Sequence, residues 1–229
     1  MADRRTPLVT GEFYHIYNRG VARQPTFLTK KDYEQALLTL SYYHFVNPPM
    51  RLSRFKGLAQ KERDAVLDKL LGNVKHVEII SFVFMPNHFH FLLRQSAEKG
   101  ISTFLSQFTN SYTRYVNTKH DRVGAMFQGV FKSVHVESEE QLIHLSRYIH
   151  LNPVVSSVVL ENKLLSYPWS SLPDYIKGES SLVWLNPVLE HFSSPKEYEK
   201  FVFDQVDYGK KLENIKHLSL EEHSFAAGN

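Results

Sequence analysis

The sequence predicts an α+β fold, in which a ferredoxin-like or RRM-like antiparallel sheet has helices packed on one face and is followed by a helical C-terminal extension. Strand-like and helix-like segments come in the order β-α-β-β-α-β-α, which is typical of this class. The two central strands are joined by Pro86-Asn87 alone, a connection too short for a parallel crossover. Hydrophobic residues make up 42% of the 229 residues, enough for a normal core.

The predicted strands are rich in β-branched and aromatic residues. Residues 11–20 alternate in side-chain character and end at Gly20, whereas residues 76–85 form a continuous apolar run typical of a buried strand. Residues 88–95 follow the turn and pair antiparallel with that run. Residues 132–137 form a short further strand.

Three segments have helical patterns. Residues 29–46 begin at Thr29, a suitable N-cap, and stop at the Asn-Pro-Pro that follows. Residues 102–119 place apolar side chains at spacings of three and four: Leu105, Phe108, Tyr112 and Tyr115. Residues 138–153 open with a capping box, Ser138 and Gln141, and Pro153 marks the predicted stop.

We expect residues 1–155 to form a catalytic domain that carries a charged helical insertion at 50–75. Residues 156–229 then form an extension packed on the same domain, with two candidate helices near 186–206 and a tail after about 207 that we expect to be flexible.

Composition excludes several classes of site and protein. The chain has no cysteine, which rules out disulfides, thiolate zinc sites and cysteine nucleophiles. It has no apolar run long enough for a transmembrane helix, and its first residues lack the apolar core of a secretory signal, so we expect a cytoplasmic protein without membrane contact. The net charge of +3 is weak support for nucleic-acid binding, although basic residues concentrate from Arg114 to Lys132.

His88 and His90 raise the central question of the sequence. Residues two apart on a strand point to the same face, so the two imidazoles share one face while Phe89, Phe91 and Leu93 share the other. Two neighbouring imidazoles are able to hold one divalent cation. Two histidines with purely structural hydrogen bonds are the alternative, and the spacing alone leaves both open.

Tyr148 and Asn152 lie four residues apart, and therefore on one face of the predicted helix 138–153. They sit at the edge of its apolar stripe, which consists of Leu142, Leu145 and Ile149. A side chain at that edge is able to reach a cleft beside the sheet. The commoner role of a helical tyrosine is to pack its ring and expose its hydroxyl, and this alternative also remains open.

These motifs together resemble the HUH-type single-tyrosine transposases of the IS200/IS605 kind. "MPNHFHFLL" (85–93) is similar to their His-hydrophobe-His strand, and "YIHLNP" (148–153) to their nucleophile helix. "YHIYNRG" (14–20), "GAMFQGVFKS" (124–133) and "YPWSSLPDY" (167–175) resemble the REP-associated tyrosine transposases in particular. Val130 departs from the expected pattern, because an arginine is typical at its place in the loop.

The resemblance implies a metal-dependent endonuclease and strand transferase that acts on hairpin-containing single-stranded DNA. Tyr148 is then the nucleophile that forms a 5′-phosphotyrosine, and His88, His90 and Asn152 hold Mg²⁺ or Mn²⁺. Aromatic and basic side chains suit unstacked bases and phosphates. The DNA-binding candidates are Arg19, Arg122, Phe127, Gln128, Phe131 and Lys132.

Other functions stay open at this point. A domesticated protein that binds hairpin DNA without transposition has the same motifs, and an RRM-like fold also suits RNA binding. A structural zinc site would need further ligands that two histidines do not supply. The sequence is compatible with a monomer and with a homodimer.

Overall fold

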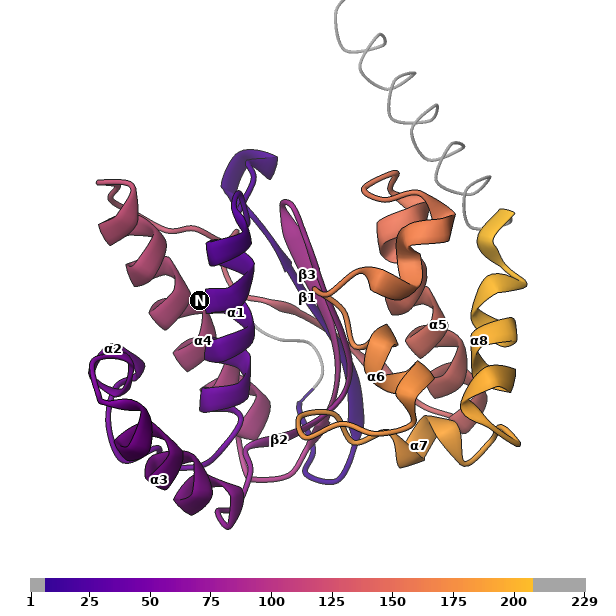
Figure 1. Ribbon diagram of the computed structural model, residues 1–229, viewed down its shortest axis with the longest axis horizontal. Helices are drawn as coiled ribbons and strands as arrows, with labels where there is room; N and C mark the ends of the chain where they lie inside the picture. Colours follow the sequence, from indigo (N-terminus) through magenta and orange to yellow (C-terminus); the bar gives the residue numbers. More distant parts are fainter. Residues whose placement is uncertain (1–6, 208–229) are drawn as a thin grey trace, which may run out of the picture.

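The computed structural model describes residues 7–207 and arranges them in three layers, with a sheet between two layers of helices (Figure 1). The sheet contains β1 (Phe13–Arg19), β2 (Val77–Met85), β3 (His88–Gln95) and β4 (Lys132–Val136). Its strand order is β2-β3-β1-β4, and each neighbouring pair is antiparallel. The predicted fold class is confirmed.

The register of the two central strands brings the N-terminal end of β3 beside the C-terminal end of β1. His88 lies opposite Arg19, and His90 lies opposite Tyr17. On the other side of β3, His88 and His90 lie opposite Met85 and Val83 of β2. Side chains directly opposite one another in an antiparallel pair share a face, so these residues form one continuous surface.

The first helical layer consists of α1 (Lys30–Tyr43) and α4 (Gly100–Lys119). Thr29 caps α1, and Asp32 completes the capping box, as the sequence suggests for the start of this helix. The Phe89 and Phe91 rings pack edge-on to Phe108 of α4, with ring centroids 5.5 Å apart in each case. The phenylalanine row of β3 therefore lies in the core on this face, as its alternation predicts.

The second helical layer begins with α5 (Glu139–Val155), which packs on the opposite face of the sheet. We predicted helices on one face only, and this part of the prediction is corrected. The physical reason lies in β2, where every residue from Ile79 to Met85 is buried. A strand that is apolar on both faces needs a covering layer on each side.

Pro153 lies inside α5 and does not end it, contrary to the prediction from sequence. The helix continues to Val155, one turn beyond Asn152. A proline has no backbone N–H to donate. At this position, close to the helix end, the helix therefore loses only one backbone hydrogen bond. Asn152 is therefore held in regular helix rather than at a frayed terminus.

The remaining helices are short and follow α5 in the second layer. They are the 3₁₀-helix η2 (Glu161–Ser166), α6 (Leu172–Lys177), α7 (Asn186–Leu189) and α8 (Pro195–Phe203). The amide nitrogens of Ser171 and Trp184 donate to the carbonyl oxygens of Phe82 and Ile79. These bonds cover the free edge of β2, which would otherwise expose unpaired backbone groups.

The segment 50–75 forms two helices, α2 (Leu52–Lys56) and α3 (Gln60–Leu71), as expected for a helical insertion. They enclose a small separate core of Tyr42, Phe45, Leu52, Phe55 and Leu70. A short 3₁₀-helix, η1 (Val21–Arg23), follows β1 at the top of Figure 1, away from α3. None of the helices within residues 7–207 has the length and apolar character that a membrane span requires.

A buried polar network fixes α5 to the helices of the extension. His150 of α5 is fully buried, with its Nδ1 atom 2.7 Å from the Tyr198 hydroxyl of α8 and its Nε2 atom 2.7 Å from the Ser171 hydroxyl. The Tyr198 hydroxyl also lies 3.0 Å from the Ser146 hydroxyl, one turn earlier on α5. Buried polar groups of this kind are stable only when each has a partner, so the network fixes the position and rotation of α5.

Replacement of Tyr198 by phenylalanine tests this network. Y198F removes one oxygen and leaves a ring nitrogen of His150 without a partner in a dry interior, which should lower the free energy of unfolding by about 1–3 kcal/mol. Chemical denaturation measures the change. Tyr148→Phe on the exposed side of the same helix is the control, and we expect its stability to stay within about 0.5 kcal/mol of wild type. Equal stability of Y198F and wild type would contradict the proposed role of the network.

Candidate active site

His88 and His90 lie side by side on the face of the sheet that α5 partly covers. Their ring centroids are 5.1 Å apart with the ring planes nearly perpendicular. His88 is half-buried at the end of β3, whereas His90 is buried, with 7% of its surface exposed. The spacing of the two histidines therefore places both rings on one face, as the alternation of β3 predicts.

His15 and Tyr17 of β1 complete this surface, although the sequence did not predict them as site residues. The Nε2 atom of His15 lies 2.8 Å from the Nδ1 atom of His90, and the two rings stack with centroids 5.0 Å apart. The Tyr17 ring stacks on His90 at 5.7 Å. The available signal was the alternating row His15, Tyr17 and Arg19, but the sequence does not show which strand β1 adjoins.

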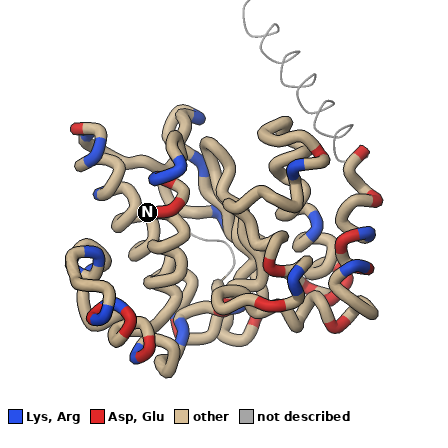
Figure 2. The backbone as a smooth tube through the Cα atoms, in the orientation of Figure 1, with Lys and Arg blue, Asp and Glu red and all other residues tan. Residues whose placement is uncertain are grey.

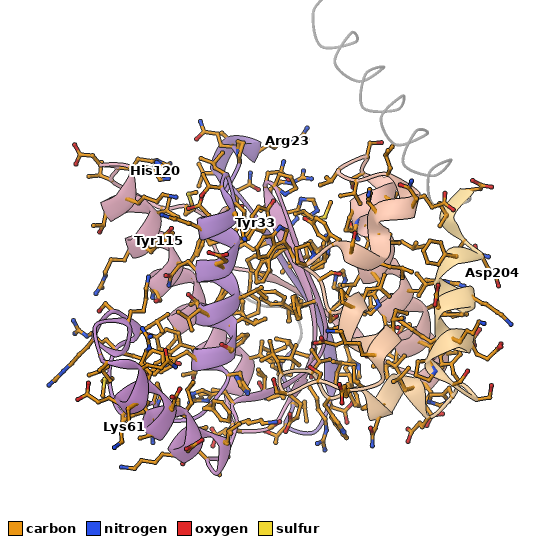
Figure 3. All side chains as sticks on the ribbon, viewed as in Figure 1. Arg23, Tyr33, Lys61, Tyr115, His120 and Asp204 are labelled. Carbon is orange, nitrogen blue, oxygen red and sulfur yellow. The ribbon has the colours of Figure 1, made fainter. Side chains whose placement is uncertain are left out.

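Tyr148 projects from α5 over the histidine row. Its ring stands edge-on to His90 and to His15, with centroid distances of 5.6 and 6.1 Å. It remains 45% exposed, so one side of the ring is open to a ligand. The competing tyrosines lie in the other helical layer: the Tyr112 hydroxyl is buried and donates to Thr26, and Tyr115 lies on α4 (Figure 3).

Asn152 stands one turn after Tyr148 and is 6% exposed. Its Nδ2 atom donates to the carbonyl oxygen of Tyr148 over 3.0 Å. Asn152 also forms a side-chain hydrogen bond with His88 that opposes the lowering of the His88 pKa, so the amide lies within reach of that imidazole.

Burial keeps the imidazoles of the site neutral at pH 7. It lowers the pKa of His15 to about 4. Burial together with the positive charge of Arg19 lowers the pKa of His88 to about 4, against the opposing hydrogen bond from Asn152. The pKa of His90 lies well below the usual range because of burial, followed by the neighbouring His15, His88 and Arg19. Neutral imidazoles keep a lone pair for a metal ion.

The donor set fits a divalent cation. His88 has the Asn87 side-chain oxygen 2.6 Å from its Nδ1 atom and also hydrogen-bonds the Asn152 side chain. When the single N–H of the neutral ring is donated to Asn87, the Nε2 atom keeps a lone pair that is available to a cation. Within residues 7–207 no cluster of three histidine, cysteine or carboxylate side chains has metal-binding geometry.

The basic candidates gather around the end of the sheet that carries His88. Arg19 is exposed opposite His88, and the Lys132 ammonium lies 5.9 Å above the Tyr17 ring on the same face. Gln128 is exposed, and its backbone N–H donates to the Arg19 carbonyl, so the loop before β4 is fixed beside this end. Figure 2 shows Lys and Arg where β1 ends, whereas α8 carries acidic and basic residues together.

The loop residues differ in how accessible they are. Arg122 is exposed, and its guanidinium contacts the Met126 sulfur, whereas Phe131 is half-buried against the core. Phe127 is only 5% exposed and packs edge-on to Phe89 with centroids 5.4 Å apart. Its proposed stacking on DNA bases is therefore corrected: an aromatic residue in a Gly-rich loop looks accessible in the sequence, but this ring fills the core beneath the sheet.

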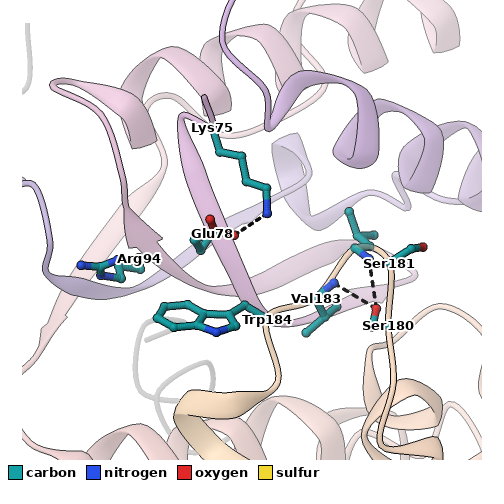
Figure 4. A pocket seen from close by; sticks show the side chains of 8 residues that line it. Lys75, Glu78, Arg94, Ser180, Ser181, Val183 and Trp184 are labelled. Carbon is teal, nitrogen blue, oxygen red and sulfur yellow. Dashed lines mark hydrogen bonds and ion pairs between the residues drawn. The ribbon is translucent and has the colours of Figure 1, made fainter. Parts of the chain in front are cut away.

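A hollow lies at the end of β2 and β3 that is opposite to His88 (Figure 4). It is lined by Lys75, Glu78, Arg94, Trp184 and the segment 180–183. Its charged groups already have partners: Lys75 pairs with Glu78 at 2.8 Å, and Arg94 donates to Gly11 and lies over the Trp184 ring. This hollow contains none of the predicted site residues.

Comparison with known families matches residues 38–152, just over half of the chain, to the family described as "Transposase IS200 like". The chain belongs to this family of DNA transposases and nucleases. A solved structure of a REP-associated tyrosine transposase bound to a REP hairpin is similar in fold, with a TM-score of 0.53, 17% sequence identity, and coverage of 80% of this chain and 91% of that chain. Comparison with curated proteins gave no match.

The depressed pKa values predict that the protein is sensitive to acid. An unfolded histidine titrates near 6.5, while folded His15 and His88 titrate near 4. Below pH 6.5 the unfolded chain therefore binds more protons, and the free energy of unfolding should fall as pH decreases from 6.5 toward 4. Each such histidine contributes a slope of up to about 1.4 kcal/mol per pH unit.

Urea denaturation of metal-free protein between pH 4.5 and 7.5 measures this slope. His88→Asn should make the slope shallower by up to one proton. His120→Asn is the matched control, because His120 is exposed at the end of α4, and it should keep the wild-type slope. A slope unchanged in H88N would contradict the neutral, desolvated state of His88.

Proposed function

We propose that this chain is a metal-dependent endonuclease and strand transferase that acts on hairpin-containing single-stranded DNA through a 5′-phosphotyrosine intermediate. The observation that carries the proposal is the position of Tyr148. It is an exposed tyrosine on a helix that a buried network fixes in place, with its ring edge-on to His90 at 5.6 Å. A nucleophile needs this combination of access and fixed orientation.

His88, His90 and Asn152 are the proposed ligands of one Mg²⁺ or Mn²⁺ ion. Two neutral imidazoles and an amide oxygen form a ligand set that such ions accept, particularly when phosphate oxygens and water complete the shell. The bound ion supplies Lewis-acid polarisation of the phosphate. Asn152 is suited to this role because its other amide atom is held by the Tyr148 carbonyl, which fixes the direction of its oxygen.

Tyr148 provides the oxygen for the covalent step. Its Oη atom attacks the phosphorus of a phosphodiester, a new P–O bond to tyrosine forms, and the bond to the 3′ oxygen of the preceding nucleotide breaks. Overall, the tyrosine proton is transferred to the departing oxygen, which leaves as a 3′-OH. The reverse attack by a 3′-OH regenerates the tyrosine and joins DNA ends with no net change in the number of phosphodiester bonds.

The surroundings of the site favour DNA over other ligands. Arg19 and Lys132 are proposed to neutralise phosphates near His88, and Arg122, Gln128 and Phe131 to follow the strand away from it. Hairpin DNA is proposed as the partner because a similar fold has been solved with a REP hairpin. RRM-like RNA binding is less favoured, since the sheet face that would carry stacking aromatics carries imidazoles and is partly covered by α5.

We further propose that residues 1–155 form the catalytic unit and that the extension after 156 serves as its support. The hydrogen bonds from His150 to Tyr198 and Ser171 motivate this division, because the extension contacts α5 on the side away from Tyr148. The extension is then required for a fixed nucleophile but contributes no ligand to the site.

Tyr148→Phe tests the nucleophile. Because it removes one exposed oxygen, the variant should fold and bind hairpin DNA like wild type but form no covalent adduct. The assay incubates full-length protein with labelled single-stranded hairpin DNA and Mn²⁺ and detects protein–DNA bands that resist SDS. Tyr115→Phe on α4 is the matched control and should keep the adduct. An adduct that persists in Y148F, or one mapped to Tyr112 or Tyr115, would overturn the assignment.

His88→Ala and His90→Ala test the metal site. Each removes a ligand outside the Phe89/Phe91 row, so the fold should persist while Mn²⁺ affinity falls at least tenfold and the adduct is lost. Titration calorimetry measures affinity independently of activity. His144→Ala, which removes a half-exposed histidine of α5, should leave both unchanged. Full Mn²⁺ affinity in H88A would refute the proposed ligand set.

A further inference from the structure

Asn87 is fixed on both sides of its amide group. It lies in the two-residue turn between β2 and β3, and its Nδ2 atom donates to the Arg23 carbonyl over 3.2 Å. Its Oδ1 atom therefore faces the other way, where it lies 2.6 Å from the Nδ1 atom of His88. An amide oxygen only accepts hydrogen bonds, so the short contact requires the proton of His88 to be on Nδ1.

The backbone holds Asn87 as firmly as its side chain. Its carbonyl accepts from the Gly20 N–H over 2.8 Å, and the preceding Pro86 carbonyl accepts from Thr26 and Phe27. Gly20 has no room for a side chain, since a Cβ atom there would meet the Gln24 carbonyl oxygen at 2.2 Å. The turn from 20 to 24, with Arg23 at its tip (Figure 3), is thus packed directly against Asn87.

His90 has an equivalent neighbour in His15. The His15 Nε2 atom occupies the Nδ1 side of His90 at 2.8 Å, so the Nε2 atom of His90 is not used by that contact. If the proton of this bond belonged to His15, neutral His90 would carry its own proton on Nε2 and would have no lone pair there. With the proton on Nδ1 of His90, His15 accepts and the Nε2 lone pair of His90 is free.

We propose that Asn87 and His15 are positioning residues that hold His88 and His90 as Nδ1–H tautomers and so present both Nε2 lone pairs to one divalent cation. The inference rests on the proposed function, which it deepens by naming the groups that orient the ligands. In these tautomers the Nε2 lone pairs of His88 and His90 are both free, as metal ligands require.

The first test needs no variant. Long-range ¹H–¹⁵N spectra of metal-free, full-length protein labelled with ¹⁵N-histidine distinguish the two neutral tautomers at pH 7.5. His88 and His90 should both show the Nδ1–H pattern. An Nε2–H pattern at either histidine in the folded wild-type protein would overturn the role of its neighbour.

Variants then test whether Asn87 and His15 are the groups that fix these tautomers. Asn87→Leu removes the acceptor at similar volume, and should lose the Nδ1–H preference of His88 and weaken Mn²⁺ binding by about 10–100-fold in calorimetry. Asn87→Asp keeps an acceptor oxygen and should keep the tautomer. His15→Phe keeps a stacked ring without nitrogen and should release the tautomer of His90 alone. Asn110→Leu, at an exposed position on α4, is the control and should change neither readout.

The outcomes separate this inference from the function on which it rests. A folded N87L protein with an unchanged His88 tautomer and unchanged Mn²⁺ affinity would refute the role of Asn87. If N87L fails to fold, the wild-type spectrum and Asn87→Asp still decide the question. A wild-type protein with both Nδ1–H tautomers that binds no Mn²⁺ would overturn the metal-dependent function and leave the tautomer assignment standing.

Discussion

The alternation of side chains along β3 is the constraint on which the rest of the structure depends. The strand has a core on one face and the proposed reaction surface on the other, and the two-residue period of a strand keeps them apart. Phe89 and Phe91 pack on α4, while His88 and His90 face α5. The same period in β1 then adds His15 and Tyr17 to the reaction surface. If β3 were shifted by one residue, its phenylalanines would move to the histidine face and its histidines would move into the core. The burial of Phe89 and Phe91 therefore also fixes the face on which His88 and His90 lie.

The second constraint is the position of α5. This helix has to be held in place while the side chain of Tyr148 stays exposed. Backbone geometry alone does not achieve this, because a helix on an apolar sheet face is able to rotate or slide. His150 points away from Tyr148 into the extension, where Tyr198 and Ser171 hold both of its ring nitrogens. The polar network acts on one side of the helix and leaves the other side for Tyr148. This arrangement gives the fully buried His150 a physical role in fixing the helix that carries Tyr148.

Periodic features could be predicted from the sequence, whereas features that depend on neighbouring strands could not. Spacing within one element is enough to predict that His88 and His90 share a strand face. It also predicts that helix 102–119 is amphipathic and that Tyr148 and Asn152 share a helix face. The roles of His15 and Asn87 depend on pairing between β1 and β3 and on packing of the turn after Gly20, which no local pattern encodes. Phe127 shows the opposite error, since loop composition suggested exposure while tertiary packing placed the ring against Phe89. The second helical layer is not visible in any local pattern, because the apolar run of β2 indicates burial but does not indicate which elements cover each face.

The protonation state of the histidines follows from their burial and from one neighbouring positive charge. Burial keeps the three imidazoles neutral, and the nearby charge of Arg19 disfavours a proton on His88 and His90. A protonated imidazole is therefore disfavoured on this surface, whereas the lone pairs of neutral imidazoles remain available to a metal ion. This is the physical basis on which the proposed function assigns a divalent ion, rather than protons, to His88 and His90. The exposed ring of Tyr148, edge-on to His90, is the group that the same proposal brings to a phosphate bound to that ion.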